Sequence, residues 1–248
     1  MRRRDLIIAA CAVGGVMALP RLRAAFAPEF VFEPLPGLVG FRQLPGGSAS
    51  GIGSVMAGLQ VPSPEQEALR DAVRAAPCAS VFGAESWQDG RVPVVVFTDY
   101  NCPYCPVLSE IVIDLAESDA PIRPIWKDLP VLGPRSEAAA VVAVAAARQG
   151  RYLPVHRQLM RTVLRPGPAA LRAIADRHGL DLVQLRADMA SPEVLGQIAR
   201  TKAVAAVFGI IGTPATLVGR TLVVGEIDAP TMRALIDVEQ AEPFETCS

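Results

Sequence analysis

The sequence predicts an α/β fold in which an all-helical segment separates two halves. Residues 94–97 are three valines and a phenylalanine, a run typical of a buried strand. Apolar residues at helical spacing follow at 107–115, so a helix comes directly after that strand. From residue 136 to residue 208 the pattern is mostly helical, and two short strand patterns and a last helix follow it.

The first 27 residues have the pattern of an export signal. Residues 2–4 are arginines, residues 6–19 are mostly apolar, and residues 25–27 resemble a signal-peptidase site. The apolar run is shorter than the roughly 20 residues that a membrane span needs. We therefore expect a periplasmic protein exported by a Sec or twin-arginine signal, with an uncleaved N-terminal anchor as the alternative.

Residues 28–62 are rich in glycine, proline and serine and predict an N-terminal arm. Residues 38–44 are its strand-like piece and could add a strand to the sheet, while residues 46–51 have the composition of a turn or linker. Ser63 followed by Pro64 then predicts the start of a helix that runs to about Ala76. We place the folded domain at residues 63–248.

The remaining elements follow the central strand in a recognisable order. A strand pattern at 122–126 precedes five helical candidates, and a hairpin and a closing helix come after them. This order is that of a thioredoxin fold with a helical insertion at about residues 135–208, which could shape an apolar groove for unfolded chains or form a plain lid. The five candidates cover residues 138–148, 152–164, 168–177, 182–190 and 192–208.

Two cysteines, Cys102 and Cys105, stand at the junction of the central strand and its helix. We expect Cys102 at the helix N-terminus and Pro103 in the first turn, where the helix dipole and unpaired amides favour a thiolate. A Cys-x-x-Cys motif in this setting is typical of a redox site. A metal site would need a second Cys/His pair at metal spacing, which the sequence lacks, so we expect no metal and no cofactor.

These motifs resemble the DsbA-type periplasmic thiol–disulfide oxidoreductases, in the branch with a Cys-Pro-Tyr-Cys site. The resemblance rests on residues 97–105, 127–134, 179–181 and 208–215, and covers about residues 63–240. It implies an enzyme that forms or exchanges disulfides in cysteine-containing exported proteins. We favour an oxidase, and an isomerase stays the alternative because this branch includes isomerase-like members and Thr213 departs from the valine of the dedicated oxidases. The resemblance also implies a membrane or periplasmic redox partner. Acidic groups outnumber basic ones after residue 27, so we expect no nucleic-acid partner.

Each cysteine of the motif has an expected part in the reaction. Cys102, which we expect to be exposed, attacks a substrate disulfide as a thiolate, and Cys105 resolves the mixed disulfide. Pro103 and Tyr104 lie between them and tune the redox potential through their backbone amides.

Further site residues follow from the family resemblance. It implies that Pro214 is a cis proline facing the cysteines and that the Thr213 backbone pairs with an extended substrate strand; the alternative is an ordinary trans proline. It also suggests Asp99 and Lys127 as a buried pair that moves the proton of the resolving thiol. A surface salt bridge is the alternative for that pair.

Two other cysteines and two other functions stay open. Cys78 and Cys247 either pair and tether the C-terminal tail or are unrelated thiols. The protein could instead be a chaperone-like binding module in which Cys102 and Cys105 form a structural disulfide. It could also be a copper(I) metallochaperone that uses the same two thiols, because copper(I) prefers thiolate ligands.

Overall fold

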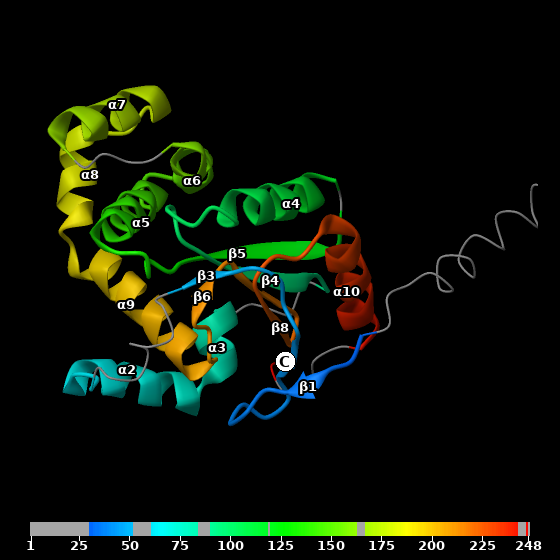
Figure 1. Ribbon diagram of the computed structural model, residues 1–248. Helices are drawn as coiled ribbons and strands as arrows, with labels where there is room; N and C mark the ends of the chain where they lie inside the picture. The colour runs from blue at the N-terminus through cyan, green and yellow to red at the C-terminus, as the bar shows by residue number, and fades with distance from the viewer. Residues whose placement is uncertain are drawn as a thin grey trace, which may run out of the picture. The chain divides into compact units, whose positions relative to one another are not determined.

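The computed structural model describes residues 30–51, 61–83, 90–118, 120–162, 167–242 and 247 (Figure 1). Contacts divide the chain into two units, Met1–Val31 and Phe32–Ser248, and nearly all described residues belong to the second. The predicted export signal at residues 1–27 and part of the arm, residues 52–60, lie outside the described residues.

A six-stranded mixed sheet forms the centre of the second unit, in the order β1-β2-β8-β7-β4-β5. The central strand β4 pairs in parallel with β5 and antiparallel with β7. All seven residues of β4 are buried, as its β-branched run predicts. The strands are β1 (Glu33–Pro34), β2 (Arg42–Leu44), β4 (Val92–Thr98), β5 (Ile122–Asp128), β7 (Ala215–Val218) and β8 (Thr221–Val224).

A second, two-stranded pair lies beside this sheet. It consists of β3 (Ser50–Gly51) from the arm and β6 (Gly212–Thr213), which run antiparallel. Residues 46–51, for which the composition predicts a turn or linker, therefore end in a short strand.

The helices confirm the predicted order. Ser63 caps α2 through a reciprocal capping box with Gln66, and α7 ends at Gly179, whose φ of +63° suits glycine. Figure 1 shows α4 and α3 on opposite faces of the sheet, with α5 to α9 as the insertion. The helices are α2 (Pro64–Ala75), α3 (Pro77–Phe82), α4 (Cys105–Glu117), α5 (Pro134–Ala147), α6 (Tyr152–Arg161), α7 (Pro168–His178), α8 (Leu182–Met189), α9 (Pro192–Val207) and α10 (Ala229–Ala241).

Two buried apolar clusters hold these elements together. One cluster joins Cys102 and Cys105 to the insertion helices α5 to α9. The other lies between the sheet and helices α2, α3 and α9, and it contains Leu35, Leu38 and Phe41 of the arm. The Phe41 ring packs edge-on against another ring of this cluster, with 5.0 Å between centroids. Residues 35–41 of the arm therefore contribute to the core.

The open question about the remaining cysteines is answered by a disulfide between Cys78 and Cys247, whose Cα atoms lie 5.5 Å apart. It ties residue 247 to α3. Within the described ranges, no helix has both the length and the apolar character that crossing a bilayer requires.

Candidate active site

The two thiols of the Cys-Pro-Tyr-Cys motif lie just after the carboxyl end of β4. The backbone turns at once, since the Cys102 N–H donates to the Asp99 carbonyl at 3.1 Å. The predicted helix start is wrong by three residues, because α4 begins at Cys105 with Tyr104 as its N-cap and Pro106 in its first turn. Cys102 and Pro103 precede the helix.

Both sulfur atoms are buried and both cysteines are unpaired. Cys102 is 3% exposed and Cys105 is 1% exposed, so the prediction that Cys102 is exposed is wrong. The Cys102 sulfur lies 3.1 Å from the Thr213 carbonyl oxygen, to which the protonated thiol donates, so Thr213 is directly beside the sulfur.

The surroundings of the two thiols shift their pKa values in opposite directions. A hydrogen bond from the Cys105 thiol lowers the pKa of Cys102 to about 6, and the Thr213 side chain and the N–H groups of Tyr104 and Cys105 act in the same direction. Burial raises the pKa of Cys105, and its interaction with Cys102 raises it further. At neutral pH the negative charge therefore resides on Cys102 while Cys105 keeps its proton.

The peptide bond between Thr213 and Pro214 is cis, as the resemblance implies. Thr213 is completely buried, and the Pro214 carbonyl accepts a hydrogen bond from the Gly225 N–H at 2.8 Å. The structure thus brings Thr213, at the end of β6, and Pro214, between β6 and β7, to the cysteines.

Asp99 lies at the site, and its carboxylate accepts hydrogen bonds that hold the backbone in place. Its carboxylate accepts hydrogen bonds from the N–H groups of Val131 and Leu132 at 2.8 and 3.0 Å, and from the Ser136 hydroxyl at 2.6 Å. It also accepts from the Asn101 N–H at 2.8 Å. These bonds fix the active-site turn to the segment that follows β5.

Lys127 lies in different surroundings. It stands opposite Phe97 in the β4–β5 pairing, and its ammonium donates to the Ser80 carbonyl of α3 at 3.1 Å. Burial lowers its pKa, and the nearby Arg200 acts in the same direction. Among the described residues no ion pair joins Lys127 to Asp99, so the contacts match neither the buried pair nor the surface salt bridge.

A buried polar network behind the cysteines is absent from the sequence-based predictions. The Tyr100 hydroxyl donates to Asp128 Oδ1 at 2.6 Å and lies 3.0 Å from His156 Nδ1. The Tyr152 hydroxyl donates to the same Asp128 oxygen at 3.1 Å, and His156 Nε2 lies 3.2 Å from the Ser109 hydroxyl. The network joins the active-site turn to β5, α6 and α4.

Burial shifts both titratable groups at the centre of this network. It raises the pKa of Asp128 to about 6 and lowers that of His156 to about 4. Asp128 Oδ2 is buried without a hydrogen-bond partner, in keeping with the raised pKa. Only the short spacing from Tyr100 to Cys102 could have pointed to this network, since the other partners lie far away in the sequence.

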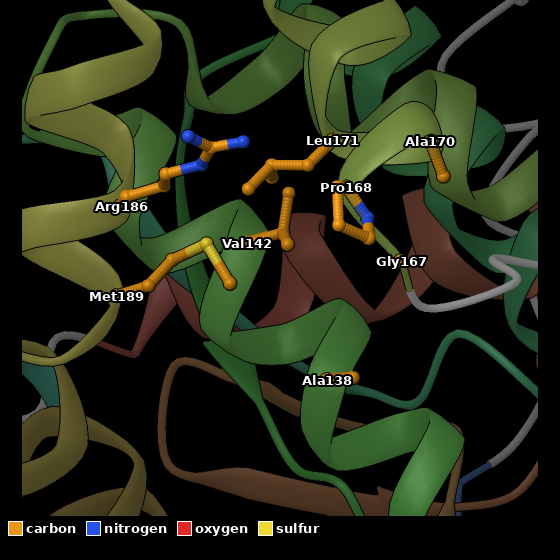
Figure 2. A pocket seen from close by; sticks show the side chains of 8 residues that line it. All are labelled: Ala138, Val142, Gly167, Pro168, Ala170, Leu171, Arg186 and Met189. Atoms are coloured by element: carbon orange, nitrogen blue, oxygen red, sulfur yellow. The ribbon is translucent and has the colours of Figure 1, made fainter.

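The insertion also carries an apolar pocket of about 490 Å³. In Figure 2, Val142 from α5 and Leu171 from α7 point toward one another, and the Arg186 side chain extends over them. Its lining is apolar apart from Arg186 and includes neither cysteine of the motif. The residues are Ala138, Val142, Gly167, Pro168, Ala170, Leu171, Arg186 and Met189.

Comparison with known proteins identifies similar domains. Residues 93–237 match the family described as the DSBA-like thioredoxin domain. A thioredoxin-like oxidoreductase from Silicibacter pomeroyi is 34% identical with a TM-score of 0.61, over 66% of this chain and 98% of that one. A periplasmic thioredoxin-like protein from Salmonella enterica serovar Typhimurium is similar in fold, with 23% identity and a TM-score of 0.57 over 74% of this chain and all of that one.

A curated relative is much longer. The Na(+)/H(+) antiporter NhaA 3 of Salinispora tropica is 32% identical over 133 residues, which are 51% of this chain and 20% of the antiporter. The chain thus spans about a fifth of the length of the curated relatives it matches.

Proposed function

The chain belongs to the family of DSBA-like thioredoxin domains and is a thiol–disulfide oxidoreductase, and from this we propose that it is exported and donates disulfides to cysteine-containing proteins. The observation that carries the proposal is the pair of free thiols in the Cys-Pro-Tyr-Cys turn, with Cys102 beside the Thr213 carbonyl and the cis Thr213–Pro214 bond, and the division of charge between Cys102 and Cys105 agrees with it. A stabilised Cys102 thiolate favours the reduced pair and so makes the disulfide form an oxidant.

The reaction begins with the Cys102–Cys105 disulfide. A client thiolate attacks the Cys102 sulfur, the bond between the two cysteines breaks, and Cys105 leaves and takes up a proton. A second client thiolate then attacks the client sulfur of the mixed disulfide and releases Cys102 as a thiolate. The client loses two electrons, and a membrane or periplasmic redox partner must remove them from the reduced pair. The raised pKa of Cys105 favours its protonation, and the lowered pKa of Cys102 suits a leaving group.

The size of the thiolate effect can be worked out. At pH 7 a thiol with a pKa of about 6 is about nine-tenths ionised, whereas an ordinary cysteine thiol is only a few per cent ionised. Ionisation therefore favours the reduced pair about tenfold, which corresponds to about 30 mV for a two-electron couple. Known pairs of this type span about 150 mV, from thioredoxin to DsbA, so ionisation of Cys102 accounts for about a fifth of that range.

The other site residues take supporting parts in this proposal. Pro103 and Tyr104 shape the turn whose amides face the Cys102 sulfur. The Thr213 backbone, next to cis Pro214, pairs with an extended client strand beside the sulfur. Asp99 holds the turn in place through its hydrogen bonds rather than by moving a proton.

Export is supported by the sequence of the first 27 residues and by the Cys78–Cys247 disulfide, because structural disulfides persist in oxidising compartments. The similar Salmonella protein is described as periplasmic. We propose a signal at residues 1–27, a redox domain at 63–248, and an arm at 28–62 that adds strands β1 and β2 to the sheet of that domain.

The reduction potential of the Cys102–Cys105 pair tests the proposed direction of the reaction. The protein, with Cys11 replaced by serine, is equilibrated with glutathione, and the redox state of the pair is read by alkylation and mass. A potential near −120 mV, roughly that of DsbA, agrees with a disulfide donor. A value of roughly −200 mV or lower would contradict it and indicate isomerase or reductase work. The Cys105→Ser variant, which cannot form the pair, is the control.

A further inference from the structure

The edge of Thr213 that would receive a client strand is already paired with another segment of the same chain. In the β3–β6 pair, Ser50 stands opposite Thr213 and Gly51 stands opposite Gly212. The carbonyl oxygen of the same Thr213 lies 3.1 Å from Cys102 Sγ. A strand from the arm therefore runs antiparallel along the residue that borders the reactive sulfur.

Glycines on both sides of this contact allow the two backbones to approach closely. A Cβ atom added at Gly51 would lie 2.5 Å from the Ile211 carbonyl oxygen, and one added at Gly212 would lie 2.7 Å from the Ser50 carbonyl oxygen. A Cβ atom at Gly47 would lie 2.7 Å from the Glu226 carbonyl oxygen. Real Cβ atoms do not come this near to backbone atoms, so the composition of the segment suits this docked position.

The arm is held firmly at its base. Phe41 is in the core, and Arg42 donates to the fully buried carboxylate of Glu239 at 2.7 Å. Strand β2, which contains Arg42, pairs in parallel with β8. These contacts fix residues 41–44 to the sheet and set the path of the residues that follow.

Residues 46–51 of the arm are held to the domain without buried side chains. Residues 46–51 carry only glycine, serine and alanine, and none of their side chains is buried. Contacts of this segment with the domain include the β3–β6 pairing and a hydrogen bond from the Glu226 N–H to the Ser48 carbonyl at 3.0 Å. A segment that buries so little apolar surface can leave without unfolding the domain.

We propose that residues 48–51 act as a built-in substitute for a client strand, which must leave the Thr213 edge before an extended polypeptide binds there. This inference rests on the proposed function, in which Thr213 pairs with the client. One backbone edge accepts one strand, so the arm and the client compete for it. Small thiols and disulfides do not need the edge, and their reaction with Cys102 is independent of this competition.

Hydrogen exchange on a trapped complex tests the inference in the full chain. A cysteine-containing extended peptide is attached to Cys102 in the Cys105→Ser variant, and the same variant carrying 2-mercaptoethanol in mixed disulfide is the control. We expect the backbone amides of residues 48–51 to exchange faster with the peptide attached than with the small thiol. Equal protection of these amides in both complexes would overturn the inference.

A pair of variants gives a second, kinetic test. In Gly47→Ala/Gly51→Ala the added methyl groups cannot fit the docked position, so the arm should be released. We expect kcat/KM for oxidation of the peptide to rise about threefold or more, because the competent state is no longer a minor one. Oxidation of 2-mercaptoethanol should stay unchanged.

The control Gly196→Ala places its methyl group near only the flexible end of Arg200 and should behave like the wild type. Equal peptide rates in the arm variant and the wild type would overturn the inference alone. A failure of Cys102 to react with either the peptide or the small thiol would instead overturn the proposed function, and the inference with it.

Discussion

Replacing Cys105 by alanine should raise the pKa of Cys102, because the hydrogen bond from the Cys105 thiol is the largest cause of the lowered value. The N–H groups of Tyr104 and Cys105 still favour the thiolate in this variant, so the pKa should rise only part of the way to its ordinary value. We expect it to move from about 6 to about 7 or above.

The consequence for reactivity is large at mildly acidic pH. At pH 6 the thiolate fraction of Cys102 should fall from about one half to about one tenth, and the alkylation rate should fall about fivefold with it. The assay is the pH dependence of iodoacetamide alkylation on a Cys11→Ser background, normalised to the plateau rate at high pH. In the wild type only Cys102 should react, because burial raises the pKa of Cys105.

The matched control is Cys105→Ser, whose hydroxyl keeps a donor at the same place. Its alkylation midpoint should stay near that of the wild type. The reasoning is refuted if Cys105→Ala titrates at the wild-type midpoint, since the neighbouring thiol would then not be what holds the charge on Cys102.

Three further predictions concern stability. Stability from a buried carboxyl with a raised pKa is lost as pH rises through about 6, whereas stability from a buried neutral histidine is lost as pH falls from 6.5 toward 4. In urea melts Asp128→Asn should therefore lose stability between pH 6.5 and 4 relative to the wild type, and His156→Gln should gain it; parallel curves for all three proteins would contradict the assigned pKa values. The double variant Cys78→Ser/Cys247→Ser should lose up to about 5 kcal/mol, the loop-closure limit for a separation of 169 residues, while the alkylation midpoint of Cys102 stays fixed. Ser63→Ala should lower the free energy of unfolding by about 1 kcal/mol, because it removes the N-cap of α2, and the urea midpoint should fall. An unchanged midpoint would show that the cap does not stabilise the protein.

Local patterns predict the central parts of the fold well. The valine run of β4, the cap at Ser63 and the cysteine motif each depend on a few neighbouring residues, and the structure confirms the elements they predict. The start of α4 at Cys105 was missed because a turn held by the Asp99 carbonyl takes up the residues that a helix could have used.

Features that depend on distant pairings could not be read from the sequence. The side chains of Tyr100 and His156 are in hydrogen-bond contact although 56 positions separate them in the sequence. No local pattern near either residue predicts this contact. Lys127 illustrates a different difficulty, since neighbouring residues of a strand point to opposite faces. Asp128 points to the polar network, whereas Lys127 bonds to α3 on the other side.

The arm contains one strand that the sequence predicts and one that it does not. The prediction that its residues 38–44 add a strand to the sheet is confirmed by β2 (Arg42–Leu44), which pairs with β8, whereas the sequence does not show that Leu35, Leu38 and Phe41 enter the core. Its strand β3 is only two residues long and exists because Gly212 and Thr213 offer an edge. No local rule could find such a pairing.

The closure of the sheet by segments far apart in the chain bears on the order of synthesis and folding. The ion pair of Arg42 needs Glu239, 197 residues later, and the disulfide of Cys78 needs Cys247, 169 residues later. The half of the sheet that contains β2 and β8 can likewise form only after residue 224 has been made, and pairings of such long range are slow. Thr213 also comes late in the chain, so the Cys102 sulfur gains the carbonyl oxygen that lies 3.1 Å from it only when this part of the sheet forms.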